Sequence, residues 1–131
     1  MVKTALNGGM ADPEPLPLLW LRVRFDGKDF IGPGKAELLE RIAATGSIAA
    51  AARDMAMSYK RAWSIVEALN AMFDQALVDT ARGGPGKGGA VLTLRGQAVL
   101  AAYREVEAAA SKGAKDALVQ LQSWRHPAKG D

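Results

Sequence analysis

The sequence predicts a mainly α-helical fold that carries a small β-hairpin, an α+β class. Two observations support this prediction. Apolar residues recur at helical spacing in several segments after residue 35. A glycine-rich segment, residues 81–90, lies between two short apolar runs, as a hairpin loop does. With 131 residues, of which 49% are apolar, the chain can build the core of one ordinary domain.

Composition excludes several classes of function. The chain has no cysteine and a single histidine, His126, so we expect no disulfide, no metal site and no nucleophile with its base. The sequence therefore predicts neither an enzyme nor a bound cofactor. It shows no apolar run of transmembrane length and no secretory signal, which predicts a cytoplasmic protein without membrane contact. The net charge of +3 is compatible with a nucleic-acid partner.

The N-terminal part is expected to contain little regular structure. Residues 1–17 hold three prolines and no apolar period, and we predict a disordered tail. Residues 18–25 end in an alternation of apolar residues with arginines, which predicts a half-exposed strand. Asp26-Gly27 offers a turn, after which residues 29–31 can return as a second short strand. The sequence Gly32-Pro33-Gly34 then ends this region.

Three helices are predicted to follow. The first spans Lys35–Thr45, the second Ile48–Met55 and the third Tyr59 to about Asp74. Ser47 and Ser58 precede the second and third helices and can cap them. The residues expected to be buried are Leu38, Leu39, Ile42 and Ala43 in the first helix, and Ala62, Val66, Leu69 and Phe73 in the third.

A hairpin and a long helix complete the predicted order. Apolar pairs at residues 77–78 and 91–92 flank the glycine loop as strands, and Thr93 can cap the helix that follows. Near-heptad apolar spacing along this helix predicts pairing with a second copy, and Gly113 is expected to kink or break it. We therefore divide the chain into a tail (1–17), a DNA-binding domain (18–95), a dimerisation helix or helices (96–124) and a second tail (125–131).

The second and third helices, joined by a short turn, are typical of a helix-turn-helix. The third helix begins with polar and basic residues, at the end where the helix dipole favours phosphate. Arginine and lysine can read guanine in the major groove, and hydroxyl groups suit phosphate oxygens. On these helices, the predicted contacts with double-stranded DNA are Ser47, Ser58, Tyr59, Lys60, Arg61 and Ser64, with Arg53 and Arg95 as weaker phosphate candidates and Trp63 as a core aromatic.

A hairpin placed directly after such a helix is the wing of a winged helix-turn-helix. Its glycines allow close approach to the DNA backbone, and Arg82 and Lys87 are predicted cationic contacts at its tip. The loop also contains the spacing G-x-G-x-x-G at Gly84, Gly86 and Gly89, which is used to bind dinucleotides. That motif requires a helix after it, whereas the residues that follow predict a strand.

At this point the sequence resembles a family. The runs TGSIAAAARDMAMSYKRAW and ALVDTARGGPGKGGAVLTLRGQAVL are similar to the N-terminal DNA-binding domain of ModE-type molybdate-responsive transcriptional regulators. Those regulators are LysR-like winged helix-turn-helix dimers, and the resemblance covers about Leu18 to Ala110. It implies a homodimeric, sequence-specific regulator linked to molybdate or metal homeostasis. Their C-terminal molbindin domains have no counterpart in this sequence, so no molybdate site is expected on this chain.

One residue departs from the family pattern. Ala56 stands in the turn where the family uses glycine, and a left-handed backbone there would cost alanine about 1 kcal/mol. Two other functions remain open. The fold can serve as a protein-interaction module that does not bind DNA, or the glycine loop can bind a nucleotide in an enzyme.

Overall fold

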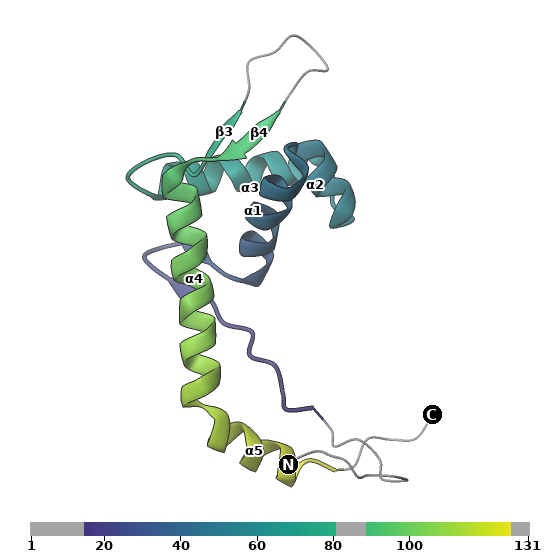
Figure 1. The fold of residues 1–131 in the computed structure, drawn as a ribbon, viewed down its shortest axis with the longest axis vertical. Helices are drawn as coiled ribbons and strands as arrows, with labels where there is room; N and C mark the ends of the chain where they lie inside the picture. The colour runs from purple at the N-terminus through teal and green to yellow at the C-terminus, as the bar shows by residue number, and fades with distance from the viewer. Residues whose placement is uncertain (1–14, 81–88, 127–131) are drawn as a thin grey trace.

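The computed structural model describes residues 15–80 and 89–126 and arranges them as a compact group of elements with a long helix leading away from it (Figure 1). The predicted fold class is confirmed: helices dominate, and the two strand pairs are small and antiparallel. The elements are β1 (Val23–Arg24), β2 (Phe30–Ile31), α1 (Pro33–Thr45), α2 (Ile48–Asp54), α3 (Tyr59–Met72), β3 (Val78–Thr80), β4 (Ala90–Leu92), α4 (Leu94–Gly113) and α5 (Lys115–Trp124).

The N-terminal strands are shorter than the predicted segments. β1 and β2 pair only through Val23 with Ile31 and Arg24 with Phe30, around a turn in which Gly27 has φ of 53°. Helix α1 starts at Pro33, two residues earlier than predicted. Proline is favoured in the first helical turn because its missing N–H would have no partner there. The segment predicted only to end a strand therefore also starts a helix.

The core is formed by side chains of α1, α2, α3 and the hairpin. Leu38, Leu39 and Ile42 of α1 are fully buried, and so are Ala62, Val66 and Leu69 of α3. The prediction for Phe73 was wrong, because this residue follows the end of α3 and is only partly buried. The prediction for Ala43 was wrong, because this residue is exposed. Successive helix residues are rotated by about 100°, which turns Ala43 away from Ile42 toward a side of α1 that no helix covers.

All three predicted N-caps are confirmed. The Ser47 hydroxyl oxygen accepts a hydrogen bond from the Ala50 N–H at 3.0 Å, and the Ser58 hydroxyl oxygen accepts one from the Arg61 N–H at 3.0 Å. Thr93 caps α4 in the same way. Each bond satisfies one backbone donor that a helix start leaves without a partner. These caps determine where the second and third helices begin.

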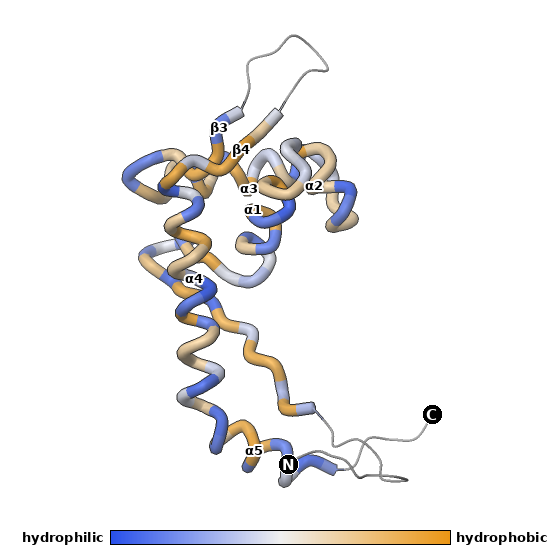
Figure 2. The backbone as a smooth tube through the Cα atoms, in the orientation of Figure 1, coloured by the Kyte–Doolittle hydropathy of each residue, from blue (hydrophilic) through white to orange (hydrophobic). Residues whose placement is uncertain are grey.

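The long C-terminal helix breaks as predicted at Gly113. Helix α4 ends there, and α5 turns away from its axis (Figure 1). Several apolar side chains of this region are exposed, among them Val106, Leu121 and Trp124 (72% exposed). Figure 2 shows apolar positions in the lower part of α4 and in α5, and among the helices that the structure describes no other one covers them.

Candidate nucleic-acid interface

The turn between α2 and α3 is held by backbone hydrogen bonds that require a left-handed residue. The Met57 N–H donates to the Ala52 carbonyl oxygen at 3.0 Å, while Ala56 takes φ of 55°. This left-handed backbone agrees with the glycine that the family uses in this turn. Ala56 therefore adopts a conformation that alanine disfavours by about 1 kcal/mol.

Helix α3 has a buried face and an outward face. Ala62, Val66 and Leu69 are buried against the core. Lys60 and Ser64, four residues apart and so on one face, point away from that core and are exposed. Ser58 is also exposed. Its hydroxyl oxygen accepts the capping hydrogen bond, which leaves the hydroxyl proton able to donate to a phosphate oxygen.

Arg61 lies on a flank of α3 rather than on its outward face. It lines a cavity of about 240 Å³ together with Met57 and Ile65, between α3 and the start of α1. One helical turn separates Arg61 from Ile65, so both occupy the same flank. Arg61 is exposed, as are Lys60 and Ser64 on the outward face.

An aromatic pair occupies the opposite flank. The rings of Tyr59 and Trp63 stack with centroids 6.3 Å apart and an interplanar angle of 20°. Trp63 is half-buried and packs against the core, in agreement with its prediction as a core aromatic. Tyr59 is 55% exposed, so its ring and hydroxyl are available at the N-terminal end of α3.

Asn70 joins α3 to the wing, a role that no sequence pattern predicted. Its side-chain oxygen accepts hydrogen bonds from the N–H groups of Leu77 (2.8 Å) and Val78 (3.0 Å). Its side-chain nitrogen donates to the Val78 carbonyl oxygen at 3.1 Å. A lone asparagine on a helix that is otherwise apolar on that side was the only signal available in the sequence. These bonds attach strand β3 directly to α3.

A second attachment joins the wing to the junction of α1 and α2. The Ala90 N–H, at the start of β4, donates to the Gly46 carbonyl oxygen at 2.8 Å. Gly46 ends α1 with φ of 74°, a conformation that favours glycine. Both strands of the hairpin are thus hydrogen-bonded to the helix-turn-helix.

The structure describes two of the other four predicted phosphate contacts. Arg82 and Lys87 lie outside the residues that the structure describes. Arg95 forms a two-point ion pair with Asp74, at 3.1 and 3.2 Å. Arg53 is exposed at the last turn of α2.

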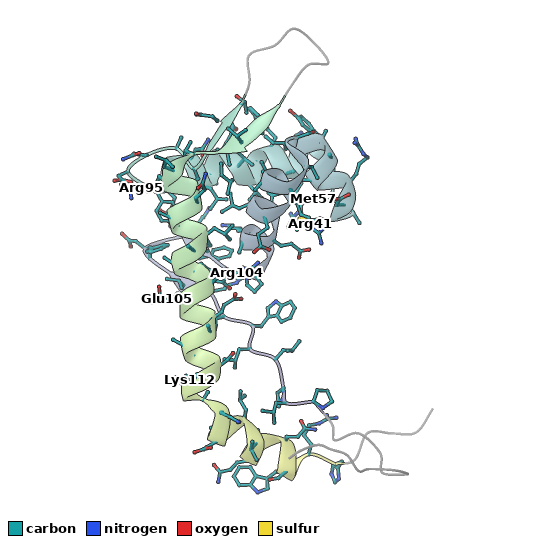
Figure 3. All side chains as sticks on the ribbon, in the orientation of Figure 1. Arg41, Met57, Arg95, Arg104, Glu105 and Lys112 are labelled. Atoms are coloured by element: carbon teal, nitrogen blue, oxygen red, sulfur yellow. The ribbon has the colours of Figure 1, made fainter. Side chains whose placement is uncertain are left out.

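The orientation of α4 relative to the helix-turn-helix is fixed by polar contacts. The Arg104 guanidinium donates to both carboxylate oxygens of Glu40 on α1, at 2.9 and 2.7 Å, and to Glu107 at 2.7 Å. Figure 3 labels Arg104 on α4. Hydrogen bonds to these carboxylates raise the pKa of Arg104. The Tyr103 hydroxyl donates to the Leu21 carbonyl oxygen at 2.8 Å, and burial raises the pKa of Tyr103.

Comparison with known proteins now assigns this architecture. Residues 34–97, from α1 to the first turn of α4, match the bacterial regulatory helix-turn-helix protein, lysR family. These residues are a LysR-type helix-turn-helix domain. The LysR-type domain contains the capped helices, the left-handed turn and both attachments of the wing.

Curated relatives confirm the resemblance found in the sequence. The LysR-type domain and its flanks are 45% identical over 82 residues to the molybdenum-pterin-binding protein MopB of Rhodobacter capsulatus, which covers 63% of this chain and 30% of MopB. The identity to the DNA-binding transcriptional dual regulator ModE of Escherichia coli K12 is 41% over 83 residues, or 63% of this chain and 32% of ModE. The chain thus spans about a third of the length of these relatives.

A solved structure shows the same fold. The protein in the crystal structure of the CbnR_DBD–DNA complex superposes with a TM-score of 0.52 and 23% identity, over 67% of this chain and 95% of that one. Within residues 15–80 and 89–126, no helix is both long and apolar enough to cross a membrane. The same residues bring no three metal-binding side chains together.

Proposed function

We propose that this chain binds double-stranded DNA sequence-specifically, as a homodimeric transcriptional regulator. The observation that carries this proposal is the outward face of α3: Lys60 and Ser64 are exposed at the capped, dipole-positive end of the second helix of the helix-turn-helix. A helix presented in this way fits the major groove, with its first turns at the base edges. Function on DNA places the protein in the cytoplasm.

Individual contacts follow from the faces of the helices. Lys60 reads a base edge or phosphate, and Arg61 reaches guanine from the flank of α3. The hydroxyl groups of Ser47, Ser58, Tyr59 and Ser64 donate to phosphate oxygens or base edges. In the wing, Arg82 and Lys87 hold the neighbouring backbone.

Dimerisation is proposed to use α4 and α5, within residues 96–124. Their exposed apolar side chains, including Val106, Val119 and Leu121, would be covered by the same helices of a second copy. The two α3 helices would then enter successive major grooves about 34 Å apart on a palindromic site. The name of MopB, a molybdenum-pterin-binding protein, supports target genes in molybdenum homeostasis. We expect no molybdate site on this chain.

The test is selection of bound duplexes from a random pool at two salt concentrations, followed by single variants on the selected site. We expect a palindromic consensus and a loss of about 1 to 3 kcal/mol for Arg61→Ala or Lys60→Ala at one base position. Lys87→Ala should weaken binding to all sequences alike and reduce the salt dependence. Lys112→Ala, which removes an exposed lysine from the end of α4, is the matched control and should bind as the wild type does.

Two results would contradict the proposal. Equal affinity of wild type for the selected duplex and for random DNA would exclude sequence-specific binding. The absence of any salt-dependent duplex binding would instead favour a protein-interaction module on the same scaffold.

A further inference from the structure

Three cationic side chains from three separate segments meet at one cavity beside α3. The cavity has a volume of about 240 Å³ and lies between the N-terminal segment, the start of α1 and the flank of α3. Arg22 comes from the residue before β1, Lys35 from the first turn of α1 and Arg61 from the first turn of α3. No carboxylate is among the lining residues that the structure describes.

Two of these cations are held in place by one aromatic ring. The Arg22 guanidinium carbon lies 4.2 Å from the centroid of Phe30, and the Lys35 ammonium nitrogen lies 3.6 Å from it. The same ammonium group donates to the Phe30 carbonyl oxygen at 3.1 Å. Cation–π contacts of this kind fix the charged groups beside the cavity instead of leaving them free in solvent.

The positive charge at this cavity is only partly compensated. Among residues 15–80 and 89–126, none of the three cations forms an ion pair within 4 Å. Burial, followed by the charge of Arg22, lowers the pKa of Lys35, and the carboxylate of Asp29 offsets part of this effect. Like charges that converge in this way favour the binding of an anion.

The rest of the lining is apolar. Trp20 is 77% exposed at one side of the cavity, and Phe30, Met57 and Ile65 form other parts of its wall. We propose that this cavity binds a small organic anion, in which a carboxylate or phosphate group meets the three cations and a planar apolar body contacts Trp20 and Met57. Guanidinium groups pair with carboxylate and phosphate through two parallel hydrogen bonds, which suits Arg22 and Arg61 to this task.

The position of Arg61 links this site to α3. A ligand that engages the Arg61 guanidinium withdraws it from DNA, so the anion and the duplex compete for one side chain. This link rests on the proposed function, whereas the binding site itself does not. The binding experiment therefore contains no DNA, and its failure is distinct from a failure of duplex binding.

The experiment is calorimetric titration of the full chain with phenyl phosphate at physiological ionic strength. We expect saturable binding, and binding about tenfold weaker in the double variant Arg22→Gln/Lys35→Gln. The matched control is Arg24→Gln/Lys28→Gln, which removes the same charge from the neighbouring β1–β2 hairpin at residues that do not line the cavity. This control should bind as the wild type does.

A second variant separates ligand binding from packing, because Arg22 and Lys35 also contact Phe30. Arg61→Gln leaves those contacts in place and should lower the affinity for phenyl phosphate without lowering the midpoint of thermal unfolding. No saturable heat with wild-type protein, or equal weakening in the control pair, would overturn the proposal. Inorganic phosphate that binds as tightly as phenyl phosphate would also overturn it, since the apolar lining would then contribute nothing.

Discussion

Two regions of this molecule have the same kind of apolar helical pattern but bury its side chains to different extents. In the head (residues 30–103), the apolar faces of α1 and α3 belong to one buried core, together with α2 and the hairpin. In the stalk (residues 104–124), only Leu118 is buried, and the other large apolar side chains remain exposed or half-exposed. The difference teaches that periodicity predicts which face of a helix is apolar, but a covering element is needed to bury it. In the stalk that element is proposed to be a second copy.

The largest expected effect is on the core of the head. Leu39→Ala removes a fully buried side chain of α1 and should lower the free energy of unfolding by about 3 kcal/mol, because it leaves a cavity. Leu121→Ala, the same substitution in the stalk, should change the stability of the monomer by less than about 0.5 kcal/mol. Denaturant unfolding at low protein concentration measures both. Equal losses would show that the stalk has a core of its own.

The next largest effect is expected on dimerisation through the stalk. Val106→Glu places a charge on the exposed apolar side of α4 and should weaken the dimer about a hundredfold, since an unpaired carboxylate would be buried between the copies. Sedimentation equilibrium measures this change. Glu105→Gln, at the exposed neighbouring position, is the control and should leave the association constant nearly unchanged. A dimer that tolerates Val106→Glu would require a different interface.

A smaller effect is expected where the wing joins α3. Asn70→Ala removes three hydrogen bonds and should lower the free energy of unfolding by about 2 kcal/mol, because the N–H groups of Leu77 and Val78 lose their acceptor. Hydrogen exchange at these two amides should accelerate more than exchange in α1. Asn70→Asp, which keeps the accepting oxygen, should retain most of the protection. Unchanged exchange in the alanine variant would show that strand pairing alone holds β3.

The smallest expected effect is a gain in stability. Ala56→Gly relieves the left-handed alanine and should raise the free energy of unfolding by about 0.5 kcal/mol, after the greater freedom of glycine in the unfolded chain is subtracted. Ala71→Gly, within the exposed side of α3, should instead lower it by about 1 kcal/mol. Thermal unfolding of the pair checks the opposite signs. Destabilisation by both would mean that strain at residue 56 is negligible.

Local chemistry explains what the sequence could predict. Ser47, Ser58 and Thr93 act on backbone groups three residues away, so their caps could be predicted from neighbours alone. The left-handed turn at Ala56 was predictable because family members place glycine there.

Contacts between distant segments could not be predicted in this way. Asn70 meets residues seven and eight positions later, across a change from helix to strand. The cavity beside Arg61 joins segments that precede it by many residues, and no periodicity places Arg22 or Lys35 beside it. Ala43 was assigned to the core because a helical pattern defines a broad face, whereas the packing of α2 and α3 determines its edge.

The hydrogen bond between Ala90 and the Gly46 carbonyl oxygen has a consequence for the length of a binding site. Strand β4 is hydrogen-bonded to the α1–α2 junction, and strand β3 is hydrogen-bonded to α3. The base of the wing therefore cannot change its spacing from α3 without breaking one of these hydrogen bonds. Under the proposed function, α3 and the base of the wing would therefore keep a fixed spacing along one half-site. Insertion of a single base pair between the sequences that the two elements touch should remove one of the contacts, however favourable each sequence is separately.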